Sequence, residues 1–172
     1  IGTMMLVPTL LERGEEWMKE KFVRPTILGD LVWCQGYSEP GSGSDLASLK
    51  TRGELVGDEW VINGQKIWTS SAMEADYMFC LVRTEPEAKK HAGISYLLID
   101  MKQPGIDVRP LKQMTGSSEF NEVFLNDVKS PFGVAAGVPY IAVVLVALAQ
   151  RGTRDTVFFA ITCSVLTPIG LG

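Results

Sequence analysis

Two short segments of the chain carry residue types that suit the binding of a flat, polar-edged aromatic molecule. The first, residues 35–45, reads Gln-Gly-Tyr-Ser-Glu-Pro-Gly-Ser-Gly-Ser-Asp. Its small residues allow tight turns, exposed amide N–H groups and close approach of a ligand to the main chain. The second, residues 63–70, reads Asn-Gly-Gln-Lys-Ile-Trp-Thr-Ser, which provides an indole to pack on a ring and hydroxyls for its heteroatoms. Together they predict a site for one ring-shaped ligand.

The order and spacing of these segments are more specific than either alone, because a Gly/Ser/Pro cluster is most often only a loop. Ser38–Asp45 followed by Asn63–Trp68 resembles the middle domain of the acyl-CoA dehydrogenase family, with its Thr/Ser-Glu-Pro-x-x-Gly-Ser-Asp loop and Asn-Gly-x-Lys-x-Trp segment. The likeness continues through Glu119–Phe124 and Asp127-Val128 and covers about residues 2 to 130.

The resemblance implies that FAD is the cofactor and that Trp68 packs against its flavin ring. A hydroxyl would reach the reactive edge of the ring, from either Thr69 or Ser70. The choice stays open because many family members have one more residue between the tryptophan and the threonine.

The loop before this segment would hold the polar rim of the flavin, through main-chain groups of Gln35 and Tyr37 and through Ser38 and its hydroxyl. Gly43 and Ser44 would lie where the flavin and the acyl-CoA substrate meet, and Ser44 is also expected to contact the substrate. Two acidic residues of the loop, Glu39 and Asp45, are expected to accept hydrogen bonds from loop amides rather than to act as bases.

The family's reaction removes two hydrogens from an acyl-CoA: a carboxylate takes the proton alpha to the thioester carbonyl, and the flavin accepts a hydride from the beta carbon. The resemblance therefore implies acyl-CoA as substrate, an electron-transfer flavoprotein as electron acceptor and a homo-oligomer for the full-length protein. No residue is predicted as the base, because the family's base lies in a C-terminal helical region that this chain is expected to lack. A non-catalytic flavin-binding or structural module, or a related flavin oxidase acting on a nitroalkane, is the alternative.

The composition of the 172 residues, 46% apolar and 21% charged, is that of an ordinary globular protein. Acidic residues number 20 and basic residues 16, so the net charge of −4 argues against nucleic acid as a partner. The chain begins at Ile1 with no basic-then-apolar signal pattern. We therefore expect a fragment of a cytoplasmic protein, or of a mitochondrial matrix protein if the source is eukaryotic.

Cysteine and histidine usage gives no sign of a metal site. Cys34, Cys80 and Cys163 contain no Cys-x-x-Cys pair, so we expect buried thiols in a reducing compartment. The single histidine, His91, has no cysteine near it for zinc and no serine motif for a hydrolase, and is expected in a solvated loop.

Apolar periodicity predicts an α+β fold in three parts. Residues 1–29 form the end of an N-terminal helical domain, with helices over Met4–Leu11 and Glu15–Ile27. Residues 30–130 form a flavin- and acyl-CoA-binding domain built as an antiparallel β-barrel, since short strands and turns alternate without the βαβ rhythm of a Rossmann fold. The predicted strands are 31–35, 49–55, 59–62 and 65–69 joined by an Asn63-Gly64 hairpin turn, 77–83, 94–101, 106–109 and 119–128.

Residues 131–172 are predicted as the third part. Residues 130–150 and 156–172 contain no charged side chain. This favours a helical start of a C-terminal domain or an aberrant end of the chain. A membrane hairpin is the alternative, since about twenty uncharged residues can cross a bilayer, but Pro139 argues against it.

Overall fold

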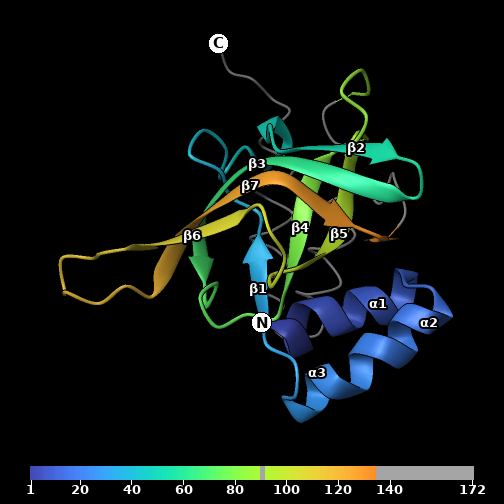
Figure 1. The fold of residues 1–172 in the computed structure, drawn as a ribbon, viewed down its shortest axis with the longest axis horizontal. Helices are drawn as coiled ribbons and strands as arrows, with labels where there is room; N and C mark the ends of the chain where they lie inside the picture. The colour runs from blue at the N-terminus through green and yellow to red at the C-terminus, as the bar shows by residue number, and fades with distance from the viewer. Residues whose placement is uncertain (90–91, 135–172) are drawn as a thin grey trace, which may run out of the picture.

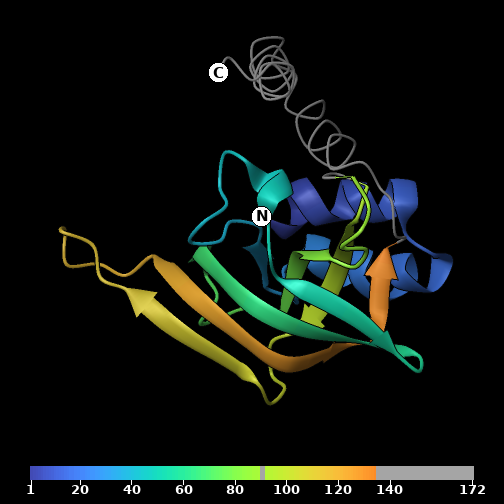
Figure 2. The same cartoon turned by 90° about the horizontal axis from the view of Figure 1, so that it is seen from above.

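Helices at the start of the chain cover one face of a strongly curled sheet in the computed structural model, which describes residues 1–89 and 92–134 (Figures 1 and 2). The predictions for His91, Cys163 and nearly all of residues 131–172 lie outside the described residues. Within the two described ranges, no helix is both long enough and apolar enough to cross a membrane.

The first 28 residues form two helical pieces that separate at Gly14, as predicted. A π-helical turn over Gly2–Leu6 leads into α1 (Val7–Arg13). After the extended residue Glu15, α2 (Glu16–Met18) passes through a second π-helical turn, Lys19–Val23, into α3 (Arg24–Leu28). Gly29 ends α3 in the left-handed conformation with φ 83°, where glycine has no steric cost.

The described residues contribute eight strands to one sheet, in the order β6-β7-β3-β2-β4-β5-β8, with β1 paired to β4. The sheet curls into a half-barrel, and its end strands β6 and β8 are not neighbours in the pairing (Figure 2). The strands are β1 (Trp33–Gly36), β2 (Arg52–Val56), β3 (Glu59–Ser70), β4 (Tyr77–Arg83), β5 (Ile94–Asp100), β6 (Ile106–Leu111), β7 (Phe120–Ser130) and β8 (Phe132–Val134).

The central strands β4 and β5 separate two apolar clusters, because their side chains alternate between the two faces of the sheet. Phe79 and Leu98 face the helices, whereas Met78 and Ile99 face the inside of the curl. The helix-side cluster is Leu6, Leu10, Met18, Phe22, Trp33, Tyr37, Leu46, Leu49, Phe79, Leu81, Ile94, Tyr96 and Leu98. The inner cluster is Cys34, Ile62, Ala72, Ala75, Met78, Cys80, Val82, Leu97, Ile99, Met101, Val123, Leu125 and Val128.

The structure confirms that Cys34 and Cys80 are buried free thiols. Burial raises the pKa of Cys34 well above its usual range, and it raises the pKa of Cys80 to about 11. Both side chains therefore stay neutral and act as small apolar residues of the core.

The hairpin turn predicted at Asn63-Gly64 is wrong, since β3 runs without interruption from Glu59 to Ser70 and the turn lies earlier, at Gly57-Asp58. Asn63 forms two hydrogen bonds with Asp127 across a bulge between β3 and β7. A Cβ at Gly64 would lie 2.7 Å from the Cα of Thr51, so the glycine allows β3 to pass close to another main-chain segment.

The expectation of a purely antiparallel barrel also needs correction. β1 pairs with β4 in parallel, and β2 contacts β4 in parallel through Arg52 and Arg83. The β2–β3 hairpin lies between β1 and β4 in sequence and serves as the crossover that a parallel pair requires. The predicted strand 106–109 is also too short, since β6 continues through Pro110 to Leu111. Among the described residues β6 is an end strand, where a proline needs no donor.

Candidate functional site

The loop after β1 is folded back on itself by main-chain hydrogen bonds. The Glu39 amide donates to the carbonyl of Ser42 at 2.7 Å, and the Ser42 amide donates to the carbonyl of Glu39 at 3.0 Å. The Asp45 carbonyl then accepts the hydroxyls of Ser42 and Ser48. Asp45 thus supports the loop through its main chain, and the prediction for its carboxylate stays a prediction.

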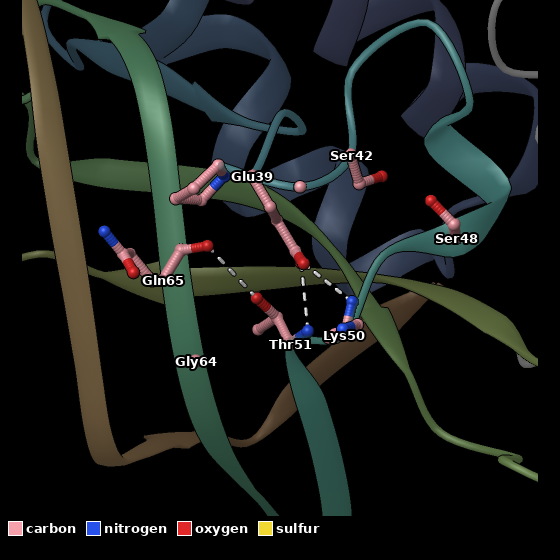
Figure 3. Close-up of a pocket in the computed structure, with 9 residues that line it drawn as sticks. Glu39, Ser42, Ser48, Lys50, Thr51, Gly64 and Gln65 are labelled. Atoms are coloured by element: carbon pink, nitrogen blue, oxygen red, sulfur yellow. Dashed lines mark hydrogen bonds between the residues drawn. The ribbon is translucent and has the colours of Figure 1, made fainter.

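Glu39 ties this loop to the strands beneath it. Its carboxylate accepts the amide of Lys50 at 2.7 Å and the amide of Thr51 at 2.9 Å, as Figure 3 shows. The prediction that Glu39 is a structural acceptor for main-chain amides is therefore confirmed. A hollow of about 260 Å³ lies beside it, lined in part by Gly41, Lys50 and Gln65 (Figure 3).

The same carboxylate forms an ion pair with Lys66 of β3, whose Nζ lies 2.8 Å from Glu39 Oε1 and 3.2 Å from the Tyr37 carbonyl oxygen. The Lys66 side chain is fully buried and that of Glu39 is 7% exposed. Burial raises the pKa of Glu39, but the Lys66 ammonium and the hydrogen bonds from Lys50 and Thr51 outweigh it, so the pKa lies below its ordinary value. Glu39 is therefore ionised and paired.

Trp68 lies on β3 only two residues after Lys66 and points outward, with 61% of the residue exposed. It occupies a bulge between Lys66 and Thr69 in the pairing with β7, and its φ of 60° is unusual for a residue with a side chain. Its ring lies edge-to-face on Phe120, with the centroids 6.1 Å apart. An exposed indole held in a strained conformation is typical of a binding surface.

The serine-rich loop and the tryptophan are direct neighbours. The Ile67 amide, next to Trp68, donates a hydrogen bond of 2.9 Å to the carbonyl of Ser38. The two segments singled out in the sequence thus share a main-chain hydrogen bond between residues that are 29 positions apart. The hydrogen bond holds the backbone of the loop beside the backbone that carries Trp68.

The two candidate hydroxyls after Trp68 have different surroundings. Thr69 is fully buried, and its carbonyl accepts a hydrogen bond from the side-chain Nδ2 of Asn121. Its hydroxyl has no hydrogen-bond partner among the described residues. Ser70 is half-buried and lines an open cavity of about 550 Å³, whose walls also include Ser118 and Phe120. Of the two, Ser70 is the one that a ligand can reach.

Comparisons with known proteins identify the family of the chain. The profile described as "Acyl-CoA dehydrogenase, middle domain" matches residues 34–128, more than half of the chain. The chain belongs to the acyl-CoA dehydrogenase family. Acyl-CoA dehydrogenase IpdE1 of Mycolicibacterium smegmatis is 47% identical over 148 residues, which cover 80% of this chain and 38% of that protein. The chain thus spans less than two fifths of the length of this relative.

Solved structures of acyl-CoA dehydrogenases share the fold. A structure described as the Tcur3481-Tcur3483 steroid ACAD aligns with 95% of this chain and 44% of its own chain, at 32% identity and a TM-score of 0.75. The ChsE4-ChsE5 complex from Mycobacterium tuberculosis aligns with 86% of this chain and 37% of its own, at 34% identity and a TM-score of 0.72.

The other predicted site residues of this acyl-CoA dehydrogenase chain differ in their exposure. Gly43 and Ser44 are exposed at the loop, and a Cβ added at Gly43 would meet no atom within 4 Å. Gln35 is half-buried on β1. The Tyr37 ring, in contrast, is buried edge-to-face on Phe79, with the centroids 5.8 Å apart, so this residue can offer a ligand only its main chain.

Sequence reasoning assigned no role to Lys66 or Phe120. The signal for Lys66 was present, because the period of two that puts Ile62 on the buried face of β3 also puts residue 66 there. A lysine at a buried strand position requires a carboxylate partner. Phe120 had no such signal, since its contact with Trp68 depends on how β3 and β7 pair.

Proposed function

We propose that this chain supplies the flavin- and substrate-binding part of an FAD-dependent acyl-CoA dehydrogenase, which introduces an alpha,beta double bond into an acyl-CoA thioester. The observation that carries the proposal is the exposed, strained Trp68 beside the Ser38 loop, joined by the hydrogen bond from Ile67 to Ser38. The family and the 47% identity to a protein named as an acyl-CoA dehydrogenase support it.

The described residues fit a flat ring with a polar rim. The Trp68 indole would pack on the ring, and Ser70 would place a hydroxyl at its edge from the wall of the 550 Å³ cavity. Ser38, with the main-chain groups of Gln35 and Tyr37, would bind the rim. FAD, when bound, supplies the acceptor for the hydride from the substrate.

The acyl-CoA would approach from the exposed side of the loop. Gly43 leaves its surroundings open and Ser44 adds a hydroxyl and an amide, groups that bind phosphate and thioester oxygens. In this role the chain's residues bind and orient the thioester, and the proton at its alpha carbon goes to a base outside residues 1–130.

We also propose that the complete protein passes its electrons to an electron-transfer flavoprotein and assembles with further copies of itself. The ChsE4-ChsE5 structure, described as a complex, supports assembly in this family. Mass measurement of the complete protein by light scattering tests this, and a monomer would contradict it.

Titration of the purified chain with FAD tests the site, with flavin absorbance and fluorescence as readouts. Wild type should bind, and Trp68→Ala should weaken binding by at least about fivefold, since an aromatic contact contributes about 1 kcal/mol beyond its buried area. Trp17→Ala is the matched control, because Trp17 is a partly exposed tryptophan on α2, in the helical part of the chain. Equal FAD affinity in wild type and Trp68→Ala would contradict the stacking role.

Turnover by the complete protein tests the reaction. An acyl-CoA with an artificial electron acceptor should be oxidised, whereas a nitroalkane should not. Flavin binding without turnover of either substrate would favour the non-catalytic module.

A further inference from the structure

Three consecutive residues of the loop are attached to β3 immediately before Trp68. The Tyr37 carbonyl and the Glu39 carboxylate both accept hydrogen bonds from Lys66 Nζ. Between them, the Ser38 carbonyl accepts the amide of Ile67. Ser38 and both of its neighbours in the chain are therefore hydrogen-bonded to β3.

The Glu39 carboxylate extends this attachment to the start of β2, since it also accepts the amides of Lys50 and Thr51 (Figure 3). One buried ion pair thus connects the loop, the approach to β2 and the middle of β3. The residues that it connects are up to 29 positions apart in sequence.

Stability alone is a poor explanation for this pair. Burying two charges costs free energy that their attraction offsets only with good geometry and further hydrogen bonds, and apolar replacements of such pairs are often as stable or more so. What an apolar pair lacks is direction: it would not fix the carbonyl of Tyr37 and the amides of Lys50 and Thr51 relative to each other.

We propose that Lys66 is a positioning residue, which through Tyr37 and Glu39 sets the place of Ser38 relative to Trp68 and so determines how tightly the flavin ring is bound. This inference rests on the proposed function, because it takes the ligand between the loop and the indole to be FAD. Because Lys66 itself is fully buried, it would act on that ligand only through these partners.

The experiment compares the 172-residue chain with Lys66→Met, with the double variant Glu39→Gln/Lys66→Met, and with Ile99→Ala. Methionine keeps the length of the side chain without its charge, and the double variant removes the buried charge that the single variant leaves unpaired. Ile99→Ala is the control for lost stability, because Ile99 is fully buried in the inner cluster, on β5.

Two readouts are measured where all variants are folded. In the first, both Lys66 variants should bind FAD at least about tenfold more weakly than wild type, the effect of about one lost hydrogen bond, while Ile99→Ala binds like wild type. In the second, amide hydrogen exchange without flavin should speed up more at Ile67, Lys50 and Thr51 than at Phe79 of β4 in both Lys66 variants, because Phe79 lies in the core and reports only the loss of global stability.

The outcomes separate the two proposals. No FAD binding by wild type would contradict the proposed function, while exchange at Ile67 still decides whether Lys66 positions the loop. Wild-type FAD affinity in the double variant, or exchange at Ile67 that changes no more than exchange at Phe79, would overturn the role of Lys66. An equal loss of FAD affinity in Ile99→Ala would reduce that role to general stability.

Discussion

The central strands β4 and β5 and the loop after β1 are held in place by opposite kinds of interaction. β4 and β5 carry apolar side chains on both faces, and Phe79, Leu98 and Ile99 are fully buried. The loop has small and polar residues, and it is fixed by the ion pair of Glu39 with Lys66 and by main-chain hydrogen bonds.

The difference matters for how each region responds to change. Apolar packing is non-directional, so β4 and β5 should tolerate replacements that conserve volume. The loop depends on individual partners, because removal of one buried charged group leaves the others without compensation. A stable central sheet thus carries a binding loop whose geometry rests on a few polar atoms.

The largest effect is expected for the polar region. Lys66→Met should lower the free energy of unfolding by about 3–5 kcal/mol, because it leaves Glu39 buried without its counter-charge. The double variant Glu39→Gln/Lys66→Met should recover much of this loss. Urea unfolding of both variants is the measurement, and equal losses in single and double variants would contradict the ion-pair explanation.

In the apolar region, Ile99→Ala should lower the free energy of unfolding by about 2–5 kcal/mol, whereas Ile99→Leu should cost less than about 1.5 kcal/mol. The alanine leaves a cavity in the inner cluster, but the leucine conserves volume. Urea unfolding again gives the values. If Ile99→Leu lowered the free energy of unfolding as much as Ile99→Ala, the centre of the sheet would depend on individual side chains as the loop does.

A smaller effect concerns the backbone at Trp68. The φ of 60° at this position is strained for alanine but not for glycine. Trp68→Gly should therefore be more stable than Trp68→Ala by about 1 kcal/mol. Both variants lose the indole, so both should bind FAD equally weakly. Thermal unfolding and FAD titration test the two halves separately, and greater stability of the alanine variant would argue against strain at this position.

The smallest effect is expected from a change of pH. The pKa of Glu39 is lowered in the folded state from its ordinary value of 4.5, so its contribution to stability is complete above that value and is lost as the pH falls through the folded-state pKa. Glu39→Gln cannot lose a charge, so its unfolding free energy should fall less steeply over this acidic range. Parallel slopes for wild type and variant would show that other carboxylates govern acid unfolding.

Sequence patterns predicted the apolar region well. The limits of β4, residues 77–83, coincide with the prediction, because a run of apolar residues bounded by polar ones identifies a buried strand. The break at Gly14 between the helical pieces was likewise predicted from local residue types.

The polar region was predicted only in part, because its contacts join distant residues. Asn63-Gly64 has the composition of a hairpin turn, but Asn63 is satisfied by Asp127, 64 residues away, and β3 continues. Strand periodicity places Lys66 on a buried face, where it needs a carboxylate, but no local pattern identifies Glu39, 27 residues away, as that carboxylate. The family resemblance predicted roles for Trp68 and Ser38, which stay predictions, and the fold was needed to show that their segments share a hydrogen bond.

Among the residues that the structure describes, β6 is an edge strand, and this has a consequence for the behaviour of the chain at high concentration. Exposed strand edges invite the strands of other molecules to add to a sheet and begin aggregation. Pro110 lies within β6 and lacks an N–H, and a proline in an edge strand turns its nitrogen toward solvent. A foreign strand approaching from that side would find no donor at this position, so the residue that interrupts the sequence pattern also discourages unwanted growth of the sheet.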